Sequence, residues 1–202
     1  MNSAPTYSGQ GPRSVAPADL IADVMISLAG KAAERRCLRA SAQGWRRMRT
    51  ADEVRAHHEA GHAVAAVVHG QYVWRLSIIR DESVRVQQTG ISMGHCIRGH
   101  TPEPPGLIKR SARADTDLHQ AAKACLFLAI AEPPYGVRAA MRIAHRLQVR
   151  TREMVEQHWP QIARLASELM ERRELGSSEI ERIVNRSKRL FPRACLGAPF
   201  PA

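Results

Sequence analysis

The stretch that most constrains this chain is HHEAGH, residues 57–62, which places two histidines four positions apart with a glutamate directly after the first. A helix turns about 100° per residue, so His58 and His62 share one face and can direct both imidazoles at one metal ion. Glu59 is turned about a quarter of a turn away, where its carboxylate can reach a water on the metal rather than the metal itself. The pattern H-E-x-x-H therefore predicts two metal ligands and, in Glu59, a general base.

The flanking residues indicate that this motif lies on a helix, which we expect over residues 52–69. Thr50 and Glu53 form a T-x-x-E capping box upstream, and Gly70 stands where a glycine often follows a helix end. One stripe of the helix is formed by Val54, His58, His62, Ala65 and Val68. Gly61 costs about 1 kcal/mol relative to alanine inside a helix, which favours a close approach of another backbone, or of substrate, at that position.

The segments HHEAGHAVAAVVHG, VWRLSIIRDE and GISMGHCIRG together resemble the peptidase domain of the FtsH family of zinc proteases. They also resemble the small stand-alone bacterial proteins that carry this domain without its AAA ATPase. The likeness covers roughly residues 50–185. In that family the third zinc ligand is an aspartate at the start of a later helix, and DTDLHQAA, residues 115–122, matches with Asp117 at the ligand position. The resemblance implies a zinc-dependent metalloendopeptidase that holds Zn²⁺ through His58, His62 and Asp117.

The residues alone leave the third ligand open. Asp115 and Asp117 at a helix start also serve as a cap and as a favourable charge for the helix dipole. Ligand-type side chains occur elsewhere too, at His95, Cys96, His100, His119, Cys125 and Glu132. Histidines of this kind are more often ordinary surface or core residues. The two cysteines are expected to be small buried hydrophobes. For Glu132 only its charge supports a role as a metal ligand.

The net charge of +11, carried almost wholly by arginine, bears on the partners. Such a charge suits a nucleic acid or an acidic protein. The arginines are dispersed, however, and aromatic residues make up only 4% of the chain, so solvated charge on helix faces is the favoured interpretation. The alternative to an enzyme is a non-enzymatic, arginine-rich binding or regulatory protein that keeps the peptidase fold and binds, for example, nucleic acid.

Three absences in the sequence guide the expected location and partners. No apolar run approaches the about 18 residues of a membrane-spanning helix, and the N-terminus lacks the basic and apolar regions of a signal peptide. We therefore expect a cytoplasmic protein with no membrane partner and with its four cysteines as free thiols. There is no G-x-x-x-x-G-K-[ST] loop, so a protein or peptide substrate would be unfolded by a separate ATPase, or handled by a self-oligomer.

The expected fold class is α+β and mainly helical, with a zinc-metallopeptidase helix, a small β-sheet and a C-terminal helical bundle. Residues 1–17, rich in proline, glycine and serine, predict a disordered N-terminus. An N-terminal helix over 18–37 and a linker to residue 49 lead to the peptidase domain over 50–190, and a flexible tail over 191–202 follows. Within the domain we expect strands over 73–79 and about 84–97, a proline-rich loop over 99–114, and helices over 115–131, 137–158, 160–175 and 178–190.

One segment departs from the family order. The family places an L-A-G-x-x-A-E helix between its sheet and its third ligand, whereas residues 98–114 are rich in proline and LAGKAAE stands at residues 28–34. We expect residues 18–37 to pack against the metal helix in place of the missing helix, with Gly30 allowing a close approach; the alternative is an independent surface helix. Substrate is expected to add as a strand at an edge near residues 91–97.

Overall fold

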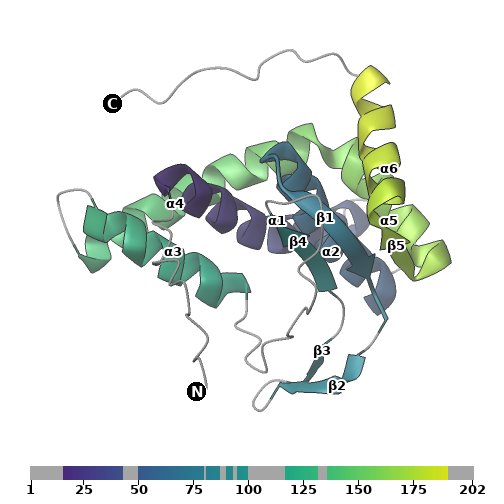
Figure 1. Ribbon diagram of the computed structural model, residues 1–202, viewed down its shortest axis with the longest axis horizontal. Coiled ribbons are helices and arrows are strands. Elements are labelled where there is room, and N and C mark those ends of the chain that lie inside the picture. The colour runs from purple at the N-terminus through teal and green to yellow at the C-terminus, as the bar shows by residue number, and fades with distance from the viewer. Residues whose placement is uncertain are drawn as a thin grey trace, which may run out of the picture.

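The computed structural model describes residues 16–42, 50–79, 81–86, 90–92, 95–99, 117–131 and 136–190. Within these ranges the chain forms six helices and two small antiparallel sheets (Figure 1). The prediction of a mainly helical α+β chain is confirmed. The expectations for residues 1–15, 43–49, 100–116 and 191–202 lie outside the described residues.

The helices follow the predicted ones closely, with differences at their ends. They are α1 (Pro17–Ala42), α2 (Ala51–Val68), α3 (Asp117–Ala131), α4 (Val137–Gln157), α5 (Trp159–Arg172) and α6 (Ser177–Leu190). None of these described helices is long and apolar enough to cross a membrane.

The predicted caps of α2 are present. The Thr50 side chain accepts a hydrogen bond from the backbone of Glu53, and the Glu53 carboxylate accepts one from the backbone of Thr50. At the other end Gly70 has a φ of +77°, a left-handed conformation that side-chain-bearing residues rarely adopt. These caps fix where α2 begins and ends, and therefore which of its residues face inward.

A three-stranded antiparallel sheet lies beside α2. Its order is β4 (His95–Gly99), β1 (Tyr72–Ser77) and β5 (Glu174–Gly176). Leu76 at its centre is fully buried and pairs with Cys96 on one side and Leu175 on the other. A separate pair of strands, β2 (Asp81–Val86) and β3 (Gly90–Ser92), makes up the second sheet.

The helix predicted over residues 160–175 is too long at its C-terminal end. Arg173 has a φ of 67° and ends α5 in the left-handed region, so the chain leaves the helix one residue later in an extended form. Leu175 is then buried in the sheet as part of β5. This strand has only three residues, and its pairing with a strand about a hundred residues earlier carries no local sequence signal.

Small residues allow α1 and α2 to pack closely along their length. Fully buried alanines line the contact, among them Ala29 and Ala33 on α1 and Ala60 and Ala63 on α2. A β-carbon at Gly61 would lie only 2.8 Å from the backbone oxygen of Ala29. The expectation that Gly61 admits another backbone is thus confirmed. So is the packing of residues 18–37 against α2, and the alternative of an independent surface helix is wrong.

Candidate metal centre

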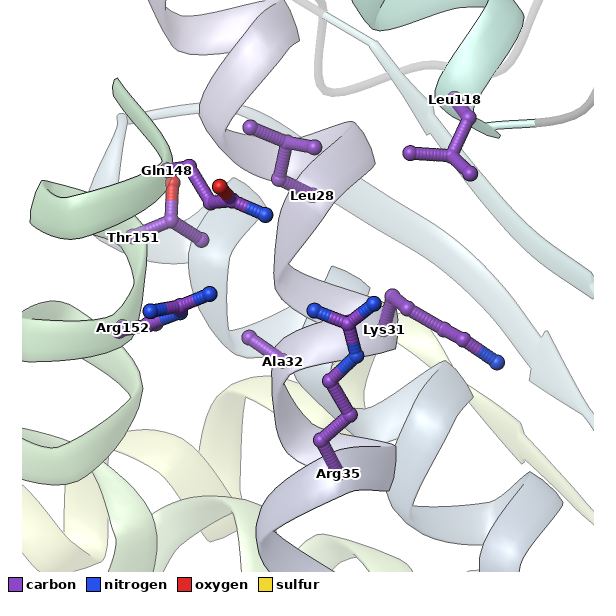
Figure 2. A pocket seen from close by; sticks show the side chains of 8 residues that line it. All are labelled: Leu28, Lys31, Ala32, Arg35, Leu118, Gln148, Thr151 and Arg152. Carbon is purple, nitrogen blue, oxygen red and sulfur yellow. The ribbon is translucent and has the colours of Figure 1, made fainter. Parts of the chain in front are cut away.

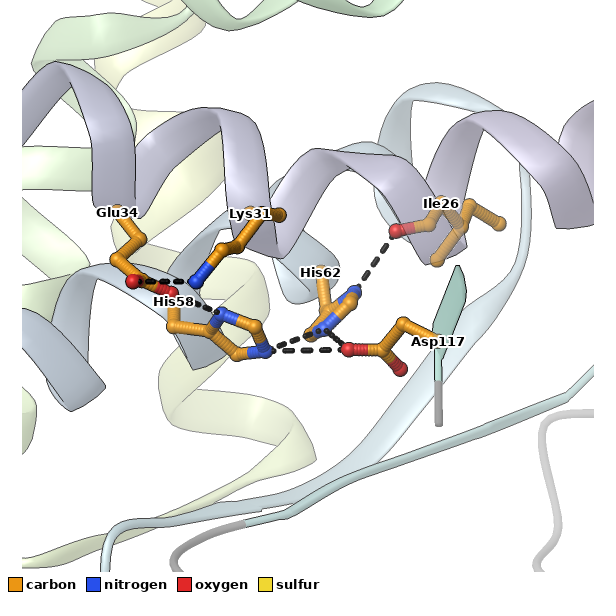
Figure 3. A network of polar contacts seen from close by, with 6 residues as sticks. All are labelled: Ile26, Lys31, Glu34, His58, His62 and Asp117. Atoms are coloured by element: carbon orange, nitrogen blue, oxygen red, sulfur yellow. Dashed lines mark hydrogen bonds and ion pairs between the residues drawn. The ribbon is translucent and has the colours of Figure 1, made fainter. Parts of the chain in front are cut away.

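Three side chains from two helices meet beside α1 (Figure 3). His58 and His62 come from α2, and Asp117 is the first residue of α3. The two Nε2 atoms lie 3.1 Å apart, and Oδ2 of Asp117 lies 3.2 Å from Nε2 of His58 and 3.1 Å from Nε2 of His62. These three atoms therefore form a nearly equilateral triangle.

The size of this triangle matches a tetrahedral metal ion. Zinc–nitrogen and zinc–oxygen bonds of about 2.0–2.2 Å, at the tetrahedral angle, separate neighbouring ligand atoms by about 3.3 Å. The three observed separations, 3.1, 3.1 and 3.2 Å, are slightly shorter than that value. One ion above the triangle would contact all three atoms and keep a fourth position open.

The outer nitrogens of both histidines have acceptors of their own, which fixes the role of the inner nitrogens. Nδ1 of His62 lies 2.8 Å from the backbone oxygen of Ile26 on α1. Nδ1 of His58 lies 3.3 Å from a carboxylate oxygen of Glu34, also on α1. An Nδ1–H that donates outward leaves the Nε2 lone pair directed at the triangle. Three electron-pair donors then face one another, an arrangement that requires a cation or protons between them.

In the metal-free chain Asp117 and His62 each favour the charged form of the other. Burial acts to raise the pKa of Asp117, but the hydrogen bonds and positive charge of His58 and His62 outweigh it and hold that pKa well below its usual range. Burial acts to lower the pKa of His62, but the hydrogen bond and charge of Asp117 outweigh it and raise that pKa. A metal ion that binds His62 would compete with a proton for that side chain.

Glu59 lies on α2 directly after the first histidine and outside the triangle. Its side chain is buried, with the residue only 7% exposed. Burial raises the pKa of Glu59, while the positive charge of His62 and His58 opposes that rise. A carboxylate with a raised pKa binds a proton more readily near neutral pH, which is the property a general base needs.

Helix α1 forms the wall behind the triangle, and two of its residues were not foreseen in that role. Glu34 contacts His58 with one carboxylate oxygen and accepts from Nζ of Lys31 with the other, at 2.6 Å. Ile26 offers its backbone oxygen to His62. Glu34 is the last residue of the segment LAGKAAE, so this segment could have indicated its role. A backbone acceptor such as that of Ile26 has no sequence signature.

Gly30 leaves the space that His62 fills. A β-carbon at this position would lie 2.3 Å from Nε2 of His62, far closer than any real contact. The expected close approach at Gly30 is therefore confirmed, and it is an approach to a candidate ligand itself.

The remaining ligand-type residues do not join the triangle. His119 is exposed on α3, Cys125 is buried and Cys96 is half-buried. No disulfide joins the three cysteines within the described ranges. Asp115, His100 and Glu132 lie outside the described residues, and so does the side chain of His95. Among the parts of the chain that the structure describes, His58, His62 and Asp117 form the one group of three or more suited to a metal ion.

No family model, curated protein or solved structure matches this chain. The resemblance to FtsH-type peptidases therefore stays a hypothesis drawn from sequence motifs. The function has to be argued from the donor triangle, the buried carboxylate beside it, and the helix that orients both histidines.

Proposed function

We propose that this chain is a zinc-dependent metalloendopeptidase of the FtsH type that hydrolyses peptide bonds in protein or peptide substrates. One observation carries the proposal: Nε2 of His58, Nε2 of His62 and Oδ2 of Asp117 converge at tetrahedral spacing. The buried carboxylate of Glu59 on the same helix supports it, because a metal site without a base would favour a structural role.

Zinc bound to these three residues would lower the pKa of a water to about 7 and polarise the scissile carbonyl. Glu59 would take a proton from that water as its oxygen adds to the carbonyl carbon and the C=O π bond opens. Glu59 would then give the proton to the leaving nitrogen as the C–N bond breaks and the C=O bond reforms, so that the carboxylate is restored. The burial of Glu59 suits both transfers, because its raised pKa brings the two protonation states closer in energy.

The sheet offers an edge to which the substrate backbone can add. Within the described residues β4 pairs with β1 alone and so lies at the sheet's edge. An extended peptide can add to such an edge through backbone hydrogen bonds. We propose that substrate binds there, at the part of the predicted edge that covers residues 95–97. A separate ATPase or further copies of this chain stay as proposed partners that would present the substrate.

The test combines metal content with proteolysis. Zinc-loaded protein is expected to retain one zinc per chain after desalting and to cleave casein, and a chelator should stop the cleavage. Glu59→Gln is expected to retain zinc and lose cleavage, since the amide is nearly isosteric but cannot accept the proton. Zinc retention without any cleavage by the wild type would instead favour a non-enzymatic binding protein. Less than half an equivalent of zinc would refute the site itself.

A further inference from the structure

A pocket lies near the candidate metal centre, where α1, α3 and α4 meet (Figure 2). Its apolar part is made by Leu28 and Ala32 of α1 and Leu118 of α3. Its polar part carries three basic side chains, Lys31, Arg35 and Arg152, together with the amide of Gln148.

Helical spacing brings these side chains to one space. Leu28, Lys31, Ala32 and Arg35 follow one stripe of α1, and Gln148 and Arg152 are four apart on the facing side of α4. Figure 2 shows the guanidinium groups of Arg35 and Arg152 directed into the gap between the two helices.

The positive charge in this pocket is only partly balanced. Lys31 forms an ion pair with Glu34 at 2.6 Å. Arg35 and Arg152 have no carboxylate partner within the described part of the chain. Two guanidinium groups that face the same space repel each other unless an anion lies between them, and a carboxylate matches their planar donor geometry.

The pocket shares its walls with the metal centre. Leu118 follows Asp117 directly on α3, and Lys31 contacts Glu34, which in turn contacts His58. An extended peptide advances by about 3.3 Å per residue. Because residues of the pocket adjoin or contact residues of the triangle, we infer that a peptide whose carbonyl lies at the triangle places a side chain a few residues away in the pocket.

We propose that this pocket binds a carboxylate of the substrate, so that the enzyme prefers peptides with an acidic group a few residues from the cleaved bond. The proposal rests on the proposed function, since it names the substrate class of the same site. Arg35 and Arg152 donate to the carboxylate, and the methylene groups of a glutamate pack against Leu28 and Leu118. The carboxylate can come from an acidic side chain or from the C-terminus of a short peptide.

Paired peptides distinguish these two sources. One set carries a single glutamate, or a glutamine in its place, at each position around the cleaved bond; the other has a free or an amidated C-terminus. We expect kcat/KM to fall about tenfold when the preferred carboxylate becomes an amide, as for a charge-assisted hydrogen bond pair. Arg35→Gln and Arg152→Gln should abolish that difference, and Arg152→Glu should shift the preference towards lysine peptides. Arg146→Gln, an exposed arginine of α4 outside the pocket, is the matched control and should keep it.

Peptide binding separates this inference from the proposed function. The dissociation constant is measured by calorimetry on zinc-loaded Glu59→Gln, with and without Arg152→Gln. If the wild type cleaves nothing while the carboxylate peptide still binds about tenfold more tightly through Arg152, the pocket stands and the peptidase assignment falls. Equal treatment of acid and amide peptides in both cleavage and binding overturns the inference, as does an equal effect of Arg152→Gln and Arg146→Gln.

Discussion

The carboxylate of Glu34 on α1 lies 3.3 Å from Nδ1 of His58 on α2. This contact holds the imidazole with Nε2 towards Asp117, and it raises the electron density that Nε2 can offer to a cation. Lys31 holds the other oxygen of the same carboxylate, so the orientation of His58 depends on a chain of two contacts that begins on the surface of α1.

Glu34→Gln is expected to weaken zinc binding about 10- to 100-fold, because a neutral amide replaces the carboxylate behind His58. Zinc affinity is measured by competition with a chromogenic chelator. Glu171→Gln, an exposed glutamate at the end of α5, serves as the control and should bind zinc like the wild type. Equal affinities for the two variants would show that Glu34 has no part in orienting His58.

Asp117→Asn is expected to lower zinc retention well below one equivalent per chain, since an amide oxygen is a far weaker ligand than a carboxylate. The control is Asp19→Asn, which changes an aspartate in the first turn of α1. There the loss should be limited to helix-dipole stabilisation, about 0.3–1 kcal/mol. If both variants keep a full equivalent of zinc after desalting, Asp117 is only a helix-terminal charge.

Gly30→Ala is expected to displace His62, because the new β-carbon would lie 2.3 Å from Nε2 in the present arrangement. Overpacking of this kind costs about 1–3 kcal/mol in unfolding free energy, and the zinc dissociation constant should rise with it. Gly176→Ala is the matched control, since no atom lies within 4 Å of its added β-carbon. Denaturant unfolding and zinc competition on both variants check the prediction, which a wild-type response at position 30 would contradict.

The stability of the metal-free chain is expected to fall as the pH rises above about neutral. The pKa of His62 is raised above its usual 6.5, so its stabilising contribution is complete below 6.5 and is lost as the pH passes the folded value. The raised pKa of Glu59 also lowers the stability as the pH rises, because its buried carboxyl favours the protonated form. The lowered pKa of Asp117 acts only in acid, where stability is lost as the carboxylate becomes protonated.

The zinc-loaded chain should show the opposite trend over the same interval, because protons compete with zinc for His58 and His62. Melting temperatures from pH 6 to 9, with chelator and with zinc, measure both trends. A metal-free melting temperature that is constant or rises over this interval would mean that His62 does not hold the proton assigned to it.

Local patterns in the sequence were enough for α2 and its two histidines. The capping box at Thr50, the glycine at position 70 and the four-residue spacing are all contained within one helix, where periodicity and capping decide the structure. The choice of Asp117 as a candidate ligand came from a motif rather than from periodicity, since a first-turn aspartate serves equally well as a helix cap.

The supporting contacts depend on how elements pack and could not be read from local patterns. The backbone oxygen of Ile26 contacts His62 only because α1 packs against α2 at one particular position along its length. Leu175 becomes a strand residue only because Leu76 lies beside it. Such long-range pairings override the local preference of the residues involved, and a single sequence gives no covarying positions to reveal them.

The order of the groups along the chain implies an order in which the centre is assembled. A chain is made from its N-terminus, so Ile26, Gly30 and Glu34 are synthesised before either histidine. Helices α1 and α2 can thus orient both imidazoles while Asp117, 55 residues beyond His62, has yet to leave the ribosome. A nascent chain at that stage would present two imidazoles that bind a metal ion weakly. Tight binding would begin only when Asp117 joins them.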